Sequence, residues 1–196
     1  MSERILEKLK TRFGTAIFET HSQFGDDTAV VDPAKWHEVM TFCRTELECD
    51  MLTDLCGVDY PDREPRLEVV AHLYSIAKRH HVRLKARIGD RELEGDVEID
   101  SVANIWPTAN WLERETFDMF GIKFKGHPDL RRLLMYPEFV GHPLRKDYPA
   151  QKTQPLVEYR TEEEAGLPLD KQAPFGPDEG MSFGRKVFTS GEGEAS

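Results

Sequence analysis

Apolar residues recur at helical spacing in two segments near the start of the chain. Between Ser2 and Phe13 they fall three or four residues apart, which predicts a short amphipathic helix that ends at Gly14. A second helix is predicted after Asp32 and Pro33, because a capping side chain followed by proline is typical of a helix N-terminus. Its predicted buried stripe is Trp36, Val39, Met40, Cys43 and Leu47.

Short runs of β-branched and aromatic residues predict strands between and after these helices. The predicted strands are residues 15–20, 28–31, 67–75, 81–87 and 92–99. The first two flank a turn at residues 24–27, and the next two flank a turn near residues 77–79. We therefore expect at least two strand pairs, and the helices must pack against them.

The predicted strand at residues 81–87 alternates strictly between two kinds of residue. Apolar Val82, Leu84 and Ala86 alternate with basic Arg83, Lys85 and Arg87. One face therefore belongs to the core, and the other carries a basic stripe. The stripe is interpreted as a solvated or partner-facing surface, with a nucleic-acid surface as the alternative, which the net charge of −10 opposes.

A third helix is predicted from Pro107 to Phe120, stopping at Gly121. Beyond it, prolines are frequent and regular periodicity is nearly absent. The pattern predicts an α+β fold, with a small mixed or antiparallel sheet packed with a few helices, followed by a long extended C-terminal strap. The predicted domains are residues 1–150, the α+β domain, and residues 151–196, the tail.

The predicted tail cannot bury enough apolar surface to offset its ordering entropy alone, so we expect it to order only against another protein. The alternative is a terminus with no role. Candidate anchors along it are Leu156, Tyr159, Leu167, Phe175, Phe183 and Phe188.

Composition narrows the classes of partner. Acidic residues outnumber basic ones by 36 to 26, which disfavours nucleic acid and anionic membrane surfaces. No apolar stretch reaches the roughly 18 residues of a membrane span, and the N-terminus lacks the pattern of a secretory signal. Cys43, Cys49 and Cys56 have no metal or cluster spacing, so ordinary thiols in a reducing compartment are expected.

The third helix breaks the expected binary pattern at two positions. On a helical wheel Glu115 falls among apolar residues, so it must find a cationic or hydrogen-bonding partner or stay protonated, and Arg131 and Arg132 are the candidate partners. Phe117 falls on the polar side. Arg114 and Asp118 are four residues apart and are expected to pair on an exposed flank. Such violations tend to mark contact or functional surfaces.

Several histidines follow or precede this helix. His127 could be a ligand or proton relay, but no cysteine, histidine or carboxylate lies at metal spacing from it. A hydrogen-bonded structural histidine is the favoured interpretation, and the same holds for His142 and for His80 and His81.

Three motifs resemble those of the respiratory complex I 30 kDa subunit family. The central motif is Glu113-Arg114-Glu115, two residues, Asp118-Met119-Phe120, six residues, His127, three residues, Arg131, and then Leu133-Leu134. The upstream motif is Val58-Asp59-Tyr60-Pro61. The downstream motif is Gly141-His142-Pro143-Leu144-Arg145-Lys146-Asp147-Tyr148-Pro149. The similarity covers roughly residues 30–150.

This resemblance implies a subunit of proton-translocating NADH:quinone oxidoreductase that is not catalytic alone. It implies no cofactor and no metal in this chain, with FMN, iron–sulfur clusters and quinone held by partner subunits. The implied partners are the other hydrophilic subunits, chiefly the large quinone-site (49 kDa-type) subunit and neighbouring iron–sulfur subunits. The implied location is peripheral, on the cytoplasmic side of the cell inner membrane, as a free-standing bacterial subunit.

The resemblance also implies a set of signature or interface residues. These are Glu113, Arg114, Glu115, Phe117, Asp118, Phe120, Gly121, His127, Arg131, Arg132, Gly141, His142, Pro143, Arg145, Asp147 and Tyr148.

Two other functions remain open from the sequence. The first is the equivalent subunit of a related membrane-bound hydrogenase or ferredoxin-dependent quinone reductase. The second is an independent enzyme that uses Glu113, Glu115, Asp118 and His127 as acid and base groups. It would require these groups to converge in a concave pocket.

Overall fold

The computed structural model describes residues 3–93 and 97–156. Its helices are α1 (Glu3–Phe13), α2 (Trp36–Thr45) and α3 (Ala109–Phe120), with short 3-10 turns at Gly14–Ala16 and Pro33–Lys35. Its strands are β1 (Ile17–Gln23), β2 (Asp26–Val31), β3 (Met51–Asp59), β4 (Leu67–Ser75), β5 (His80–Ile88), β6 (Glu98–Asp100) and β7 (Lys123–Lys125). The α+β fold expected from the sequence is confirmed.

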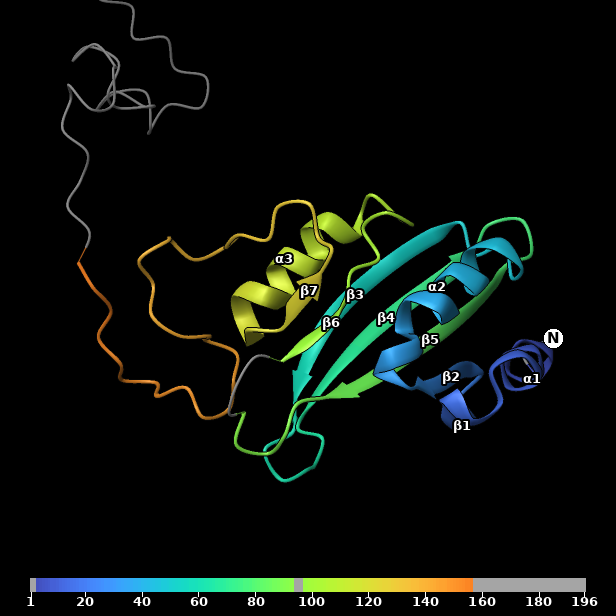
Figure 1. The fold of residues 1–196 in the computed structure, drawn as a ribbon, viewed down its shortest axis with the longest axis horizontal. Coiled ribbons are helices and arrows are strands. Elements are labelled where there is room, and N and C mark those ends of the chain that lie inside the picture. Colours follow the sequence, from blue (N-terminus) through green and yellow to red (C-terminus); the bar gives the residue numbers. More distant parts are fainter. Residues whose placement is uncertain (1–2, 94–96, 157–196) are drawn as a thin grey trace, which may run out of the picture. The chain divides into compact units, whose positions relative to one another are not determined.

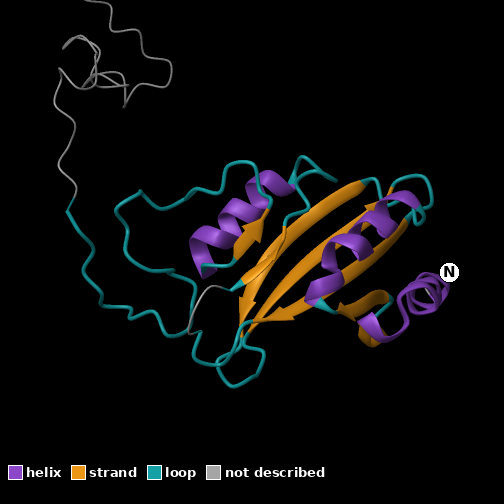
Figure 2. Cartoon of the chain, in the orientation of Figure 1, coloured by secondary structure: helices purple, strands orange, loops and turns teal. Residues whose placement is uncertain are grey.

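The main sheet is mixed and has the strand order β1-β2-β5-β4-β3. The pair β2–β5 is parallel and the other neighbouring pairs are antiparallel. Strands β6 and β7 form a separate, two-stranded parallel sheet. Helix α2 crosses one face of the sheet, and α3 packs beside β3, as Figures 1 and 2 show.

The predicted core faces are confirmed. The side chains of Val82, Leu84 and Ala86 on β5 are fully buried, and they share one cluster with the buried stripe of α2 and with Leu47, which follows the helix. Asp32 caps the turn before α2 by accepting a hydrogen bond from the Ala34 amide at 3.0 Å. The core therefore follows directly from the local periodicity of the chain.

The basic stripe on β5 is neutralised within the sheet itself. Lys85 pairs with Glu68 of β4 at 2.8 Å, and Arg87 pairs with Glu19 of β1 at 2.9 Å. Arg83 lies 3.4 Å from the carboxylate of Asp26. Acidic groups on three other strands of the sheet thus balance this row of cations.

Three elements differ from the sequence-based expectation. Strand β3 was not predicted, because its sequence lacks clean alternation and its register shifts between Leu52 and Asp54. The strand expected at residues 92–99 is described only as β6, and residues 94–96 lie outside the described part. Helix α3 begins two residues later than expected, because Pro107 lies in the preceding turn.

The predicted tail falls mostly outside the described residues. Of its candidate anchors only Leu156 is described, and it is exposed. Before that point, Gln154 accepts a hydrogen bond from the Val140 amide at 2.9 Å, and the Pro155 carbonyl accepts one from the Tyr136 hydroxyl at 3.0 Å. The division at residue 150 stays a prediction.

Candidate functional site

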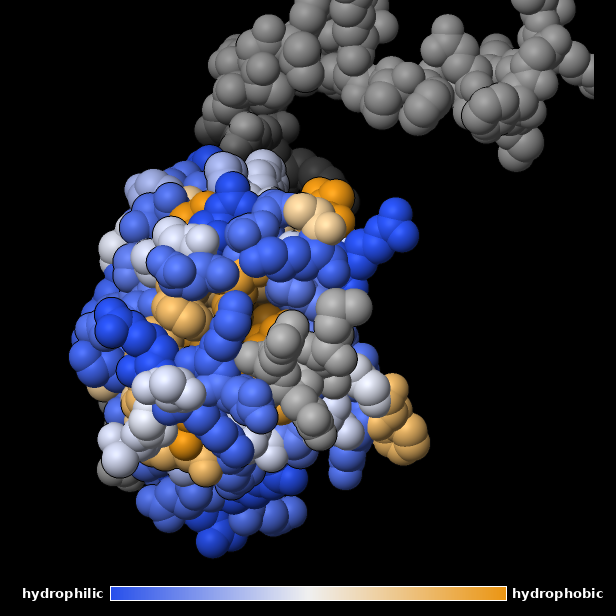
Figure 3. All heavy atoms as spheres, turned by 90° about the vertical axis from the view of Figure 1, so that its right-hand side faces the viewer, coloured by the Kyte–Doolittle hydropathy of each residue, from blue (hydrophilic) through white to orange (hydrophobic). Residues whose placement is uncertain are grey.

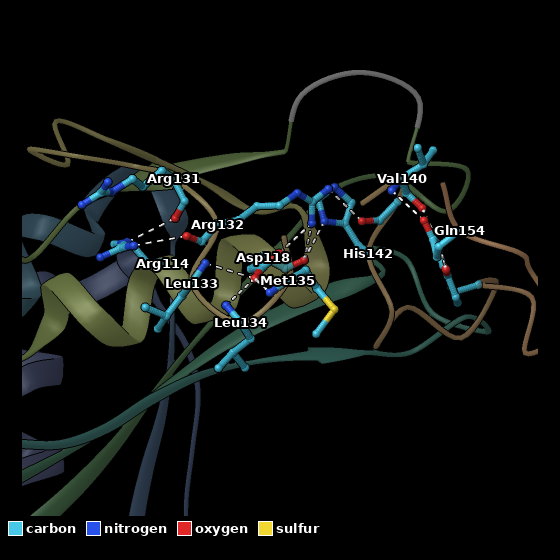
Figure 4. A network of polar contacts seen from close by, with 12 residues as sticks. Arg114, Asp118, Arg131, Arg132, Leu133, Leu134, Met135, Val140, His142 and Gln154 are labelled. Carbon is cyan, nitrogen blue, oxygen red and sulfur yellow. Dashed lines mark hydrogen bonds and ion pairs between the residues drawn. The ribbon is translucent and has the colours of Figure 1, made fainter. Parts of the chain in front are cut away.

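The three sequence motifs lie together although they are far apart in the chain. Residues 58–61 end strand β3, residues 113–134 run from α3 past β7, and residues 141–149 follow in irregular backbone. Figure 4 shows the polar contacts where the central and downstream motifs meet. We call this the Asp118 junction; its members are Arg114, Asp118, Arg132, Leu133, Leu134, Met135, Gly141, His142 and Arg145.

The buried carboxylate of Asp118 is the centre of this junction. Its Oδ1 atom accepts a hydrogen bond from the Arg132 guanidinium at 2.6 Å. Its Oδ2 atom accepts from three consecutive backbone amides, those of Leu133 at 3.1 Å, Leu134 at 2.8 Å and Met135 at 2.8 Å. Burial alone would raise the pKa of Asp118, but these donors together hold the pKa below its usual value. One carboxylate thus fixes a stretch of backbone that has no regular secondary structure.

The downstream motif supplies hydrogen-bond donors to the C-terminal end of α3. The last carbonyl groups of a helix have no partner within the helix and must find one elsewhere. The pairs are Asp118 O with His142 Nδ1–H at 2.9 Å, Met119 O with the Leu144 amide at 3.2 Å, and Phe120 O with Arg145 Nε–H at 2.6 Å. Residues 142–145 therefore complete the hydrogen bonding of the helix end.

Gly121 makes this close approach possible. Its φ is +77°, and a Cβ atom there would lie 2.6 Å from the His142 ring and 2.6 Å from Arg145 Nη2. Glycine alone avoids both the backbone strain and the collision.

Two arginines hold backbone carbonyl groups of the same segment. Arg114 donates to the carbonyls of Arg131 and Arg132, each at 3.1 Å. Arg132 also donates to the Gly141 carbonyl at 3.0 Å. The prediction that Arg114 pairs with Asp118 on an exposed flank is wrong, because both side chains are buried and each is engaged by other partners.

The upstream motif joins the downstream one through a second set of contacts, the Asp59 junction, formed by Asp59, Arg66, Lys146 and Asp147. Arg66 binds both carboxylate oxygens of Asp59, at 2.8 and 2.9 Å. It also pairs with Asp147 at 3.0 Å, and the Lys146 amide donates to Asp59 at 2.7 Å. The strand end at Asp59 thereby anchors the chain after residue 145.

Helix α3 carries a second buried carboxylate besides Asp118, that of Glu113. It accepts hydrogen bonds from the Ser101 hydroxyl at 2.6 Å and the Val102 amide at 2.7 Å. Burial raises the pKa of Glu113 to about 7, although both hydrogen bonds act in the opposite direction. Glu113 therefore fixes the loop after β6 against the helix.

His127 is buried beside Glu113. Its Nδ1 atom accepts from the Asp129 amide at 3.0 Å, so Nε2 carries the proton and donates to the Asn110 carbonyl at 3.1 Å. Its Nε2 lies 4.0 Å from the Glu113 carboxylate. The prediction of a hydrogen-bonded histidine at this position is confirmed.

The prediction that Glu115 occupies the inner face of α3 is wrong, because this residue is exposed. Helix α3 is covered by β3 and by the segments after β6 and β7, so nearly its whole circumference is buried and only a narrow strip remains open. The two candidate partners of Glu115 are engaged elsewhere. Arg132 pairs with Asp118, and Arg131 pairs with Asp129 at 2.9 Å at the surface.

The aromatic members of the predicted set lie at the edge of the Asp118 junction. Phe117, expected on the outer face of α3, is half-buried and meets the His142 ring edge-on, with ring centroids 6.2 Å apart. Tyr148 stacks on Phe139 with centroids 6.0 Å apart. Pro143 is half-buried and lies between His142 and Leu144, which both bind carbonyl groups of α3.

Sequence reasoning missed two residues that matter for this geometry. Arg66 precedes the residue that faces Asp59 across the β3–β4 pair, so recognising β3 as a strand would have placed the two side chains together. Ser101, which binds Glu113, carried no signal, because the contact depends on how the loop after β6 returns to α3.

The described residues do not include a group of three or more histidine, cysteine or carboxylate side chains placed to hold a metal ion. Within the same residues, no helix is long and apolar enough to cross a membrane. Burial raises the pKa of Cys49 to about 11 and raises that of Cys43 well above its usual value, so both thiols stay protonated at neutral pH.

Comparisons with known proteins give one consistent result. Residues 29–154 match the family described as the respiratory-chain NADH dehydrogenase 30 kDa subunit. Proteins whose names identify them as a subunit of NADH-quinone oxidoreductase are similar to the chain. The one from Geotalea uraniireducens is 43% identical over 150 residues, which cover 76% of this chain and 89% of that protein. The one from Citrifermentans bemidjiense is 44% identical and covers 76% and 91%.

Among solved structures, the fold is similar to a chain of the membrane-bound sulfane sulfur reductase, an archaeal respiratory membrane complex. The TM-score is 0.61 at 26% identity, and the match covers 76% of this chain and 86% of that one.

Proposed function

The chain belongs to the family of the respiratory-chain NADH dehydrogenase 30 kDa subunit, and we propose that it is a structural subunit of the peripheral arm of proton-translocating NADH:quinone oxidoreductase. It supports electron transfer from NADH to quinone by holding its neighbours in place. In this proposal FMN, the iron–sulfur clusters and quinone are bound by partner subunits, and the isolated chain is not catalytic.

The observation that carries the proposal is how the motif side chains are used. Asp118, Arg114 and Arg132 bind backbone groups, and so do His127 and His142. Groups committed to the backbone are not available as acids, bases or nucleophiles toward a substrate. Their arrangement instead fixes the shape of an irregular surface, as a docking subunit requires.

We propose that this shaped surface contacts the large quinone-site subunit and the neighbouring iron–sulfur subunits. Exposed apolar side chains gather in α3 and the segment after it, namely Trp111, Leu134, Tyr136, Val140 and Leu144. The end of the unit that bears α1 and the β1–β2 hairpin is mostly hydrophilic, with small apolar patches (Figure 3), although Phe18 and Phe24 of the hairpin are exposed. Exposed apolar residues of this kind mark protein–protein contact sites.

In this proposal the buried signature residues act indirectly, by fixing the backbone that carries this surface. We propose that the subunit lies on the cytoplasmic side of the inner membrane and is held there through its partners.

The structural match to the sulfane sulfur reductase supports a second candidate, the equivalent subunit of a related membrane-bound respiratory complex. The two candidates share the fold and the scaffold role, and they differ in the electron donor. An NADH-oxidising flavin subunit in the same complex identifies the first candidate.

The test is to purify the tagged full chain from gently solubilised membranes, identify the accompanying subunits by mass spectrometry and measure NADH-dependent quinone reduction. We expect flavin and iron–sulfur subunits together with that activity. Asp118→Asn should lower the recovery of partners, whereas Asp129→Asn, at an exposed Asp–Arg pair, should not. Recovery of the chain alone as a stable species would refute the proposal.

A further inference from the structure

A small pocket lies between strand β3 and helix α3. It has a volume of about 150 Å³, and its apolar lining includes Leu55, Met119, Phe120 and Leu144. A cavity of about this size accommodates a single group as large as benzene. Leu144 is also one of the exposed apolar side chains of the proposed docking surface, so the pocket is continuous with that surface.

Two carboxylates line the same pocket, Asp54 of β3 and Glu115 of α3. Both are exposed, and within residues 3–93 and 97–156 neither has an ion-pair partner. The half-buried thiol of Cys56 also lines the pocket; burial raises its pKa, and the charges of Asp54 and Glu115 raise it further. Both carboxylates therefore share one small pocket with this thiol.

Glu115 is the acidic residue of the central motif that the fold leaves unused. Glu113 and Asp118 on the same helix are buried and bind groups of their own chain. Helix α3 packs beside β3, the last strand of the sheet, and the pocket opens where these two elements meet. A partner side chain that enters the pocket would meet Glu115 directly.

We propose that this pocket receives a basic side chain, arginine or lysine, of the neighbouring subunit, and that Asp54 and Glu115 bind its cationic end. The apolar lining suits the aliphatic stem of such a residue, and the two carboxylates suit its charged head. A free divalent cation fits less well, because hard cations require about six oxygen ligands. The inference rests on the proposed function, since it needs the assembled complex.

Cys56 gives a direct measurement of whether the pocket is filled. The test is to alkylate the free full chain and the purified complex with iodoacetamide at pH 8 and follow Cys56 by mass spectrometry. We expect alkylation in the complex to be at least about tenfold slower, the change that about 1.4 kcal/mol of occupancy produces. Cys43 and Cys49 are buried and serve as internal references.

The variants Glu115→Gln and Asp54→Asn test the charge requirement. Removing either charge also lowers the pKa of Cys56, so each variant's rate in the complex is compared with that of its own free chain. We expect each variant to lose most of the protection. Glu115→Asp, which keeps the charge, and Glu46→Gln, at an exposed residue of the α2 end, should keep it. If Glu115→Gln fails to assemble, the protection of Cys56 in the wild type and in Asp54→Asn still tests whether the occupant is basic.

A carbodiimide distinguishes the two possible side chains, because it joins a lysine but not an arginine to Glu115 or Asp54. Alkylation of Cys56 in an intact complex as fast as in the free chain would show an empty pocket, and the scaffold function would stand. Protection that survives both charge-removing variants would mean that the occupant is not basic. A chain that recovers no partners would instead refute the proposed function.

Discussion

The sheet region and the motif region of this unit are held together in different ways. The sheet, with α1 and α2, buries a continuous apolar cluster, and its strands hydrogen-bond to one another along their length. The segment from α3 to Pro149 has only one short strand after the helix, and its irregular backbone is tied down by Asp118, Arg132 and Asp59.

This difference predicts different responses to substitution. Apolar burial is spread over many side chains, so its loss weakens the whole unit cooperatively. A polar junction concentrates several bonds on one side chain, so its loss releases one segment while the sheet persists. A surface that a partner must recognise is thereby fixed by few residues.

The largest effect is expected in the sheet region. Leu84→Ala removes a fully buried side chain, and we expect the free energy of unfolding to fall by about 4 kcal/mol. Urea denaturation followed by circular dichroism measures this change, with a single transition for the whole unit. Ile76→Ala, at an exposed side chain, is the control and should change stability by less than about 0.5 kcal/mol. Equal effects of the two variants would contradict the assignment of the core.

The next largest effect is expected at the Asp118 junction. Asp118→Ala leaves Arg132 without its carboxylate and three amides without an acceptor, so we expect a loss of about 3 kcal/mol. Hydrogen exchange should accelerate at the amides of residues 133–135 while the amides of β4 and β5 stay protected.

The matched control for this variant is Asp129→Ala. Asp129 pairs with Arg131, but both side chains are exposed, so a change of about 0–1 kcal/mol is expected. If sheet and junction amides exchanged together in Asp118→Ala, the two regions would form one cooperative unit and the contrast would fail.

The pH dependence of stability should report on the buried carboxylates of the motif region. Because burial raises the pKa of Glu113 to about 7, the folded chain holds this proton more tightly than the unfolded chain. Its contribution is fully present below the unfolded pKa and is lost as pH rises through about 7, by up to roughly 3 kcal/mol. Asp118 and Asp59 have lowered pKa values, so their contribution is lost in acid, below the unfolded pKa.

Urea midpoints at pH 5 and pH 8 measure the Glu113 contribution. Compared with the wild type, Glu113→Gln should raise the midpoint at pH 8 relative to that at pH 5, and Glu115→Gln, at an exposed residue of the same helix, should leave the wild-type difference unchanged. The same difference between pH 5 and pH 8 in Glu113→Gln as in the wild type would assign the titration to another group.

The smallest effect is expected at the helix end. Gly121→Ala places a methyl group 2.6 Å from His142 and Arg145, whereas Gly126→Ala meets no atom within 4 Å. Both glycines have positive φ, +77° and +80°, so both variants share the same backbone cost. We expect Gly121→Ala to be less stable than Gly126→Ala by about 1–2 kcal/mol in thermal unfolding, the cost of overpacking. Equal losses would mean that the close packing of Gly121 against the downstream motif does not contribute to stability.

Part of this structure could be predicted from the sequence because its signals are local. The periodicity of residues 3–13 and 36–45 placed α1 and α2, and alternation along residues 67–75 and 81–87 placed β4 and β5. Strand β3 escaped prediction because its bulge interrupts the alternation. The sequence motifs contain most residues of the Asp118 junction, although not Met135, and they do not indicate which of these residues bind one another.

The error over Glu115 illustrates what was not local. A helical wheel assumes one buried face, but α3 is covered on several sides by segments distant in the chain, so Glu113 and Asp118 are buried and Glu115 is exposed. Arg132 was a correct candidate partner, although its carboxylate is Asp118 and not Glu115.

The sequence by itself determined the α+β class, the positions of the three helices and of strands β1, β2, β4 and β5, and the family to which the chain belongs, because periodicity and motif identity are properties of neighbouring residues. Only the tertiary structure decided which carboxylates are buried, which backbone groups they bind and which one is left facing outward beside Cys56. Burial and hydrogen bonding are set by segments that meet after folding, so they carry no signature in the local order of residues.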